Sequence, residues 1–335
     1  FGASQLRLQE FDFSKLDLEA FPEESKRLNL DRISTKEIVY HMNKRAAELA
    51  REALEIHRGD DGYDNRPLFV IGSLGPSNKV LSSTHADLQK GTYTEIEENF
   101  YDQTIGLIDG GVDILIYDTQ QDILELKVAI FGAKRAMAEK GLDLPIIAQV
   151  TVDQFSRMQI FHTDIQAAIT TLQDIGIHAL GINCSLGPEQ MGATVEKMSR
   201  YSRIPISIVP NAGLPESEAG KTVFKLTPDK LAMYLKRFIT DYGIQIVGGC
   251  CGTTPDHIRA VAKAIKDIKP AERNCDHRTR ISGPQQAVVL NSESALIRIG
   301  ERLNVRGSKK VRIAVEESDP IDHEALEEVA SEQVR

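Results

Sequence analysis

The sequence predicts an α/β protein of the (β/α)8 TIM-barrel type. Short β-branched runs alternate with amphipathic helical patterns along most of the 335 residues, which is typical of a parallel sheet with right-handed crossovers. Cysteines and unusual polar residues fall at the ends of four different strands. An open doubly wound sheet gathers its functional residues at one switch point, whereas a barrel distributes them around one rim. The second pattern favours the barrel.

Six segments are predicted as buried strands, because each is a short run rich in β-branched residues. They cover residues 68–73, 112–119, 145–151, 179–184, 205–210 and 244–249. Helical patterns alternate with these strands and follow the last one. They cover residues 94–108, 123–138, 164–175, 189–200, 228–240 and 255–268.

An earlier helix is predicted over about residues 35–57. Ser34 and Glu37 form a capping box at its start. Four apolar residues recur at helical spacing and are expected to form its buried face: Ile38, Met42, Leu49 and Ala53.

Charge and hydropathy exclude several classes of function. The net charge is −9, which argues against nucleic acid or an anionic membrane as a partner. No apolar run approaches the roughly 20 residues that span a bilayer, and the start of the chain has no signal-peptide pattern. A cytoplasmic location is expected.

Three of the four cysteines are candidate metal ligands. Cys250 and Cys251 are adjacent in VGGCCGTTPDH, where flanking glycines allow the backbone to bend sharply enough for both thiols to reach one ion. Thr254 is expected to cap the following helix, whose positive dipole end lowers thiol pKa values. Cys184 ends another strand on the same rim. Three thiols on one rim fit a zinc site with an open fourth position, which is typical of catalytic zinc.

Spacing alone leaves two other interpretations open. Buried cysteines are common in protein cores, and no CxxC pair marks a zinc site here. A closed structural site of four thiolates would need Cys275, which lies in a polar, turn-rich segment after the last helix.

Several motifs resemble the cobalamin-dependent methionine synthase family. INCSLGPE, PNAGLP and VGGCCGTTPDHIRA, in this order and spacing, are similar to the homocysteine-binding module of that family. RPLFVIGSLGPSNK and VDILIYDTQQDILELK look like two earlier strands of the same module. IGERLNVRGSKK is similar to the opening of the pterin-binding module that follows it. The resemblance covers nearly the whole chain.

The resemblance implies a zinc site and its chemistry. Cys184, Cys250 and Cys251 would hold Zn²⁺ and serve as the catalytic residues. Homocysteine would lose its thiol proton on binding the metal and attack the methyl group of methylcobalamin, giving methionine. Methyltetrahydrofolate would be the ultimate methyl source, and cobalamin would bind a module absent from this chain. The alternatives are a cobalamin-independent enzyme that uses betaine or S-methylmethionine, or a catalytically dead fragment.

The resemblance also implies roles for four other residues. Asp118 would receive the ammonium group of homocysteine, Asn211 would complete the zinc shell when substrate is absent, and Gly75 would shape the substrate rim. Asn304 would meet the pterin. Each residue is also compatible with an ordinary capping or turn role.

The resemblance gives an expected domain layout. Residues 1–269 would form the homocysteine-binding zinc barrel, 270–294 a linker and 295–335 the start of a pterin-binding domain. This last part is expected to contain the first strand, at residues 295–300, and the first helix of a second α/β barrel. The barrel is expected to need two more strands before Phe1, so the chain alone is expected to be inactive. The loop 155–164, FSRMQIFHTD, departs from the glycine-containing loop of the family.

Overall fold

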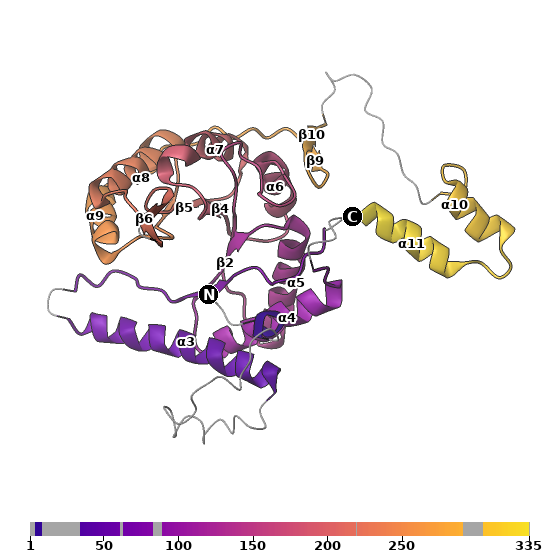
Figure 1. The fold of residues 1–335 in the computed structure, drawn as a ribbon, viewed down its shortest axis with the longest axis horizontal. Helices are drawn as coiled ribbons and strands as arrows, with labels where there is room; N and C mark the ends of the chain where they lie inside the picture. The colour runs from indigo at the N-terminus through magenta and orange to yellow at the C-terminus, as the bar shows by residue number, and fades with distance from the viewer. Residues whose placement is uncertain are drawn as a thin grey trace.

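The computed structural model describes residues 4–8, 34–60, 63–82, 89–218, 220–290 and 304–334. Its centre is a curled, six-stranded parallel sheet with helices on its outer side (Figure 1). This half-barrel confirms the predicted barrel-type fold.

All six predicted strands are present in the sheet. Their order follows the chain: β1 (Ile71–Leu74), β2 (Ile114–Gln120), β3 (Ile146–Val150), β4 (Ala179–Asn183), β5 (Ile206–Val209) and β8 (Ile246–Val247). Because every pairing is parallel, all six carboxyl ends lie on one rim. Every residue of the central strands β3 and β4 is buried, which explains their continuous apolar sequence.

The predicted helices also form, with ends within about three residues of the expected ones. They are α3 (Thr35–Arg58), α4 (Tyr93–Asp109), α5 (Ile123–Glu139), α6 (Ile165–Leu172), α7 (Pro188–Tyr201), α8 (Pro228–Tyr242) and α9 (Pro255–Ile265). A short helix, α1 (Gln5–Leu8), precedes them. The capping box at Ser34 and Glu37 is confirmed.

Residues of β2 alternate between two environments. Tyr117 is fully buried on the helix side, where its hydroxyl donates to the Ala129 carbonyl of α5 at 2.9 Å. Its ring centroid lies 6.0 Å from that of Phe100 in α4. The next residue, Asp118, is half-buried and therefore faces the inner side of the sheet.

The predicted apolar face of α3 was wrong. Its buried residues are Val39, Asn43, Ala47 and Leu54, whereas Met42 and Leu49 are about half exposed. The helix lies so close to α4 that a Cβ on Gly110 would be 2.6 Å from the Ala47 Cβ. Such close packing requires small side chains, so the bulkier apolar residues of α3 turn away.

Two hairpins were not predicted. β6 (Pro215–Glu218) and β7 (Lys221–Phe224) pair between β5 and α8. β9 (Arg280–Ser282) and β10 (Ala287–Val289) pair within the expected linker and pack on α6. The Thr171 and Ser282 hydroxyls are 2.7 Å apart at that contact. The interdomain role of residues 270–294 stays a prediction.

The C-terminal part of the chain is helical. It contains α10 (Lys309–Arg312), the π-helix η3 (Ile313–Glu317) and α11 (His323–Val334). The predicted strand at 295–300 lies outside the described residues. Within the described ranges, none of the helices combines the length and apolar character needed to cross a membrane.

Candidate metal centre

Three thiols gather at the carboxyl rim of the sheet. Cys184 follows β4, and Cys250 and Cys251 follow β8. Their sulfur atoms all lie within 4.8 Å of one another. The Sγ–Sγ distances are 3.7 Å between Cys184 and Cys251 and 3.9 Å between Cys250 and Cys251. The structure therefore brings together the three cysteines predicted as one ligand set.

The backbone around these cysteines bends sharply. Cys184 and Ser185 both have positive φ, at 61° and 64°, which turns the chain back at the end of β4. Gly252 has φ of 76°, and a Cβ there would lie 2.3 Å from the ring of Phe224. Only glycine fits this position, so the predicted need for backbone freedom beside the paired cysteines is borne out at Gly252.

Backbone hydrogen bonds fix the double-cysteine loop on the strand beside it. Cys250 N–H donates to the Pro210 carbonyl at 2.8 Å, and Ala212 N–H donates to the Cys251 carbonyl at 2.9 Å. The Asn211 side-chain oxygen accepts from Cys251 N–H at 3.0 Å. The loop after β5 therefore supports both cysteines.

The sulfur spacing fits a tetrahedral metal ion. With zinc–sulfur bonds of 2.3 Å, two ligands of a tetrahedral site are separated by about 3.8 Å. The separations of Cys251 Sγ from the Cys184 and Cys250 sulfur atoms, 3.7 and 3.9 Å, agree with that edge. One face of such a tetrahedron is occupied by the three thiols, and the fourth corner is left for another ligand. Cys251 is exposed and the other two cysteines are half-buried, so the cluster is accessible from solvent.

The thiols are electrostatically coupled. The Cys250 thiol, then the Ser185 N–H, the Cys251 thiol and the Asn211 side chain favour the thiolate and lower the pKa of Cys184 to about 5. The interaction with Cys184 and burial raise the pKa of Cys250. Burial and the same neighbour raise the pKa of Cys251. Protein groups alone thus stabilise one thiolate, and a bound dication would favour all three.

Two other predicted site residues lie at the same rim. Asn211 is 3% exposed and contacts both Cys251 and Cys184. Asp118, near the end of β2, accepts from the Ser73 hydroxyl at 2.8 Å. This bond holds the Asp118 carboxylate between the adjacent strands β1 and β2.

Of the three remaining residues, Gly75 lies at the rim, and Asn304 and Cys275 lie elsewhere. Gly75 directly follows β1 and is half-buried in the rim loop. Asn304 is exposed in the turn before α10, where its side chain accepts from Gly307 N–H. Cys275 donates to the Ser202 carbonyl at 3.1 Å and is not part of the sulfur cluster.

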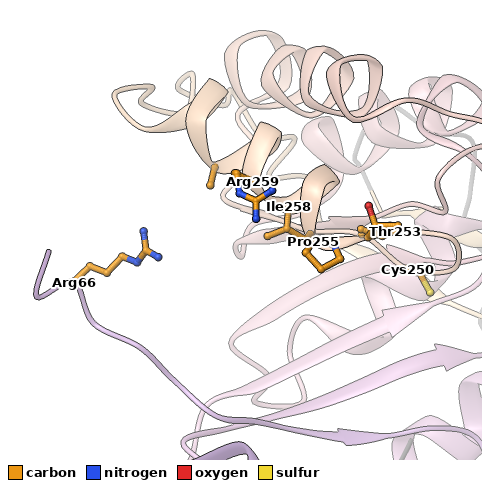
Figure 2. A pocket seen from close by; sticks show the side chains of 9 residues that line it. Arg66, Cys250, Thr253, Pro255, Ile258 and Arg259 are labelled. Carbon is orange, nitrogen blue, oxygen red and sulfur yellow. The ribbon is translucent and has the colours of Figure 1, made fainter. Parts of the chain in front are cut away.

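A cavity of about 640 Å³ adjoins Cys250. Figure 2 shows Cys250 at one end and Arg66, from the segment before β1, facing the start of α9. Arg66 and Arg259 line its outer part, and both side chains are mainly exposed. The cavity therefore lies beside Cys250 and the start of α9.

Two buried polar residues in the segments that carry the thiols were not predicted as site residues. His257 is 7% exposed, and its Nε2 lies 2.8 Å from the Leu226 carbonyl while Nδ1 lies 3.3 Å from Thr254 N. Asn183 is 2% exposed, and its Nδ2 lies 3.9 Å from Cys250 Sγ. The only sequence signal for Asn183 is its position before Cys184.

The fold and the grouped thiols define a parallel α/β half-barrel with a candidate metal centre on its carboxyl rim. Residues 20–265 match the profile of the homocysteine S-methyltransferase family. The chain belongs to the homocysteine S-methyltransferase family, and it is therefore a methyltransferase.

Two curated relatives are methionine synthases. The protein of Mycobacterium tuberculosis (strain ATCC 25618 / H37Rv) is 36% identical over 299 residues, which cover 88% of this chain and 24% of the relative. That of Mycobacterium leprae (strain TN) is 35% identical over 272 residues, covering 80% and 22%. The chain spans about a quarter of the length of these relatives.

Solved structures share the fold. The apo form of the homocysteine methyltransferase MmuM from Escherichia coli superposes with a TM-score of 0.55 at 22% identity, over 78% of this chain and 92% of that one. Its metallated form gives a TM-score of 0.53 at 21% identity, over 68% and 72%. These similarities support the barrel-type architecture.

Proposed function

We propose that this chain binds Zn²⁺ through Cys184, Cys250 and Cys251 and uses it to activate the thiol of homocysteine for methylation to methionine. The observation that carries the proposal is the sulfur cluster, with all three atoms within 4.8 Å at the carboxyl rim. Three ligands and an open fourth position are typical of catalytic zinc. Membership of the homocysteine S-methyltransferase family supports the choice of substrate.

Bound Zn²⁺ would supply a Lewis acid that keeps a substrate thiol ionised at neutral pH, well below a free thiol's pKa of about 8.5. The chain's own residues would position the substrate. Asp118 would receive the ammonium group, with its carboxylate held by Ser73. Asn211, which accepts from Cys251 N–H, would complete the zinc shell when substrate is absent, and Gly75 would border the bound substrate.

We propose methylcobalamin as the methyl donor, with methyltetrahydrofolate as the ultimate methyl source. Both would bind modules outside residues 1–269 of this chain. Support comes from the methionine synthase relatives, at 35–36% identity, and from the IGERLN motif. In this proposal residues 295–335 begin the pterin-binding module, where Asn304 would contact the pterin, and residues 270–294 connect the two modules.

Calorimetry tests the proposed thiol activation. Homocysteine is titrated into the zinc-loaded chain at pH 7 in buffers of different ionisation enthalpy. Free homocysteine is mainly a thiol at this pH, so binding as a thiolate should release close to one proton. The metal-free chain serves as the control and should release none. Homocysteine binding without proton release would contradict the proposal.

A further inference from the structure

Both the oxygen and the nitrogen of the Asn183 side-chain amide form contacts at the carboxyl rim of the sheet. Its Oδ1 accepts from the backbone N–H of Thr119 at 2.7 Å, and its Nδ2 donates to the Thr119 hydroxyl at 2.9 Å. The same Nδ2 lies 3.9 Å from Cys250 Sγ. Because a backbone N–H can only donate, the atom that faces it must be the amide oxygen, which fixes the orientation of the nitrogen toward the sulfur.

Thr119 is held in an unusual conformation. Its φ is 60°, in the left-handed region that β-branched residues rarely adopt. The register between β2 and β3 shifts at this point, between Tyr117 and Gln120. The two bonds from Asn183 hold both the backbone and the side chain of Thr119. Such outliers persist where the surroundings fix them, and they occur often at functional sites.

The contacts continue from Thr119 to Asp118. The Thr119 hydroxyl lies 3.5 Å from Asp118 Oδ2, and Ser73 donates to Asp118 Oδ1 at 2.8 Å. Asn183 is at the end of β4 and Asp118 is near the end of β2, with β3 between them. Thr151, just after β3, donates its hydroxyl to the Asn183 carbonyl at 3.2 Å. The ends of three neighbouring strands are thus joined at Asn183.

We propose that Asn183 is a positioning residue that fixes the Cys250 thiolate and the Asp118 carboxylate relative to each other. The inference rests on the proposed function, in which Cys250 binds the metal and Asp118 receives the substrate's ammonium group. An N–H donor near a metal-bound thiolate lowers the electron density of the sulfur, and outer partners of this kind orient the ligand. The same amide holds Thr119, and through it the carboxylate on the neighbouring residue.

The first test uses cobalt as a spectroscopic probe. The 335-residue chain is loaded with Co²⁺, and the thiolate-to-cobalt charge-transfer band is recorded for wild type, Asn183→Asp and Asn183→Ala. Both variants remove the donor to Cys250, so the band should move to lower energy. Zinc affinity, measured by chelator competition, should fall roughly tenfold.

Asn99→Asp is the matched control for the cobalt test. Asn99 is also 2% exposed, and its Oδ1 also accepts a backbone N–H, from Leu6 at 3.2 Å. It lies in the helix α4, whereas the three thiols follow the ends of β4 and β8. This variant reproduces the burial and the chemical change but should leave the cobalt band and the zinc affinity unchanged.

The second test measures the link to Asp118. In a double-mutant cycle on homocysteine affinity, Asp118→Asn should weaken binding much less in the Asn183→Ala background than in wild type. Thr119→Val removes only the hydroxyl, so it should disturb the fold less than the Asn183 variants do. It should weaken homocysteine binding several-fold and leave the cobalt band in place.

The outcomes separate this inference from the proposed function. If wild type shows no thiolate charge-transfer band, the proposed metal site and this inference both fail. A second outcome contradicts only the role of Asn183. In that outcome wild type shows the band, the Asn183 variants show it at the same energy, and the effects of Asn183→Ala and Asp118→Asn on homocysteine affinity are additive.

Discussion

At the scale of single residues, the glycines beside the paired cysteines are not equivalent. Gly252 has φ of 76°, and an added Cβ would meet the Phe224 ring at 2.3 Å. A Cβ on Gly248 would meet only Val209 methyl carbons, at 3.6 Å or more. Position 252 therefore excludes a side chain, whereas position 248 has enough space for a Cβ at ordinary van der Waals distance.

Gly252→Ala should therefore destabilise the chain and weaken metal binding. The positive φ alone costs about 1–2 kcal/mol for a residue with a Cβ, and the clash with Phe224 adds to it. Gly248→Ala is the matched control and should change neither property appreciably. Chemical denaturation and zinc titration of both variants measure the effects. Equal losses in the two variants would contradict this account of the loop.

Asp118→Asn should weaken homocysteine binding roughly tenfold while leaving zinc content unchanged, because a hydrogen bond to a charged group contributes about 1.5–3 kcal/mol. Calorimetry with homocysteine and with 4-mercaptobutyrate, which lacks the ammonium group, isolates the contact. The variant should bind the second thiol as wild type does. A matching loss for both thiols would mean that Asp118 acts on something other than the ammonium group.

The residues differ in how far sequence could predict them. Cys250 and Cys251 are recognisable because they are adjacent and flanked by glycines, and Cys184 because it ends a predicted strand. Asn183 and its contact with Thr119 depend on where β2 and β4 stand relative to each other. No local pattern encodes that distance, so this part of the site needed the fold.

At the scale of elements, the strands and helices of the barrel were predictable because each has its own periodic pattern and caps. The buried face of α3 was not, because close packing of Ala47 against Gly110 decided it rather than apolar spacing. The hairpin of β6 and β7 was also missed. Its strands are four residues long and mostly exposed, so they lack the apolar alternation that marks a strand.

The first turn of α5 supports the rim loop after β1. Glu125 is 2% exposed and accepts from Ser77 N–H at 2.7 Å. Asp122, the cap of α5, accepts from the N–H groups of Leu81 and Ser82. Burial raises the pKa of Glu125 to about 7, despite the hydrogen bond from Ser77.

Glu125 should make stability depend on pH. The folded chain holds its proton up to about pH 7, whereas the unfolded chain releases it near 4.5. The contribution of protonated Glu125 to the free energy of unfolding is therefore complete below pH 4.5 and is lost as the pH rises through 7. Glu125→Gln should match wild type at pH 5 and be more stable at pH 8, by roughly 3 kcal/mol. Urea denaturation at both pH values measures this.

Glu95→Gln provides the control of opposite sign. Glu95 is an exposed residue of the α4 capping box, and hydrogen bonds from Thr92 lower its pKa. Its stabilising effect is present above its unfolded pKa and lost at lower pH. Removing its charge should therefore not stabilise the chain at pH 8. Equal behaviour of the two variants would contradict the assignment to Glu125.

At the scale of the whole molecule, the sheet is open. β1 and β8 are its two edges, and no strand within the described residues pairs with their outer sides. Phe69, just before β1, is 61% exposed, and Ile71, the first residue of β1, is 47% exposed. Exposed sheet edges with apolar side chains favour pairing between copies.

The chain should therefore self-associate as its concentration rises, and it should bind an apolar dye. Ile71→Lys places a charge at the edge and should reduce association without lowering the melting temperature. Analytical ultracentrifugation and thermal melts measure the two properties. A wild-type chain that stays monomeric and binds no dye would show that its edges are covered in another way.

The central claim is that three particular thiols form one metal site. Metal analysis of wild type and of the four single Cys→Ser variants tests it most directly. Cys275 is the internal control, because its thiol faces the Ser202 carbonyl. The account predicts about one zinc per chain in wild type and in Cys275→Ser, and loss of tightly bound zinc in Cys184→Ser, Cys250→Ser and Cys251→Ser. A wild-type chain without zinc, or loss of zinc in Cys275→Ser alone, would contradict it.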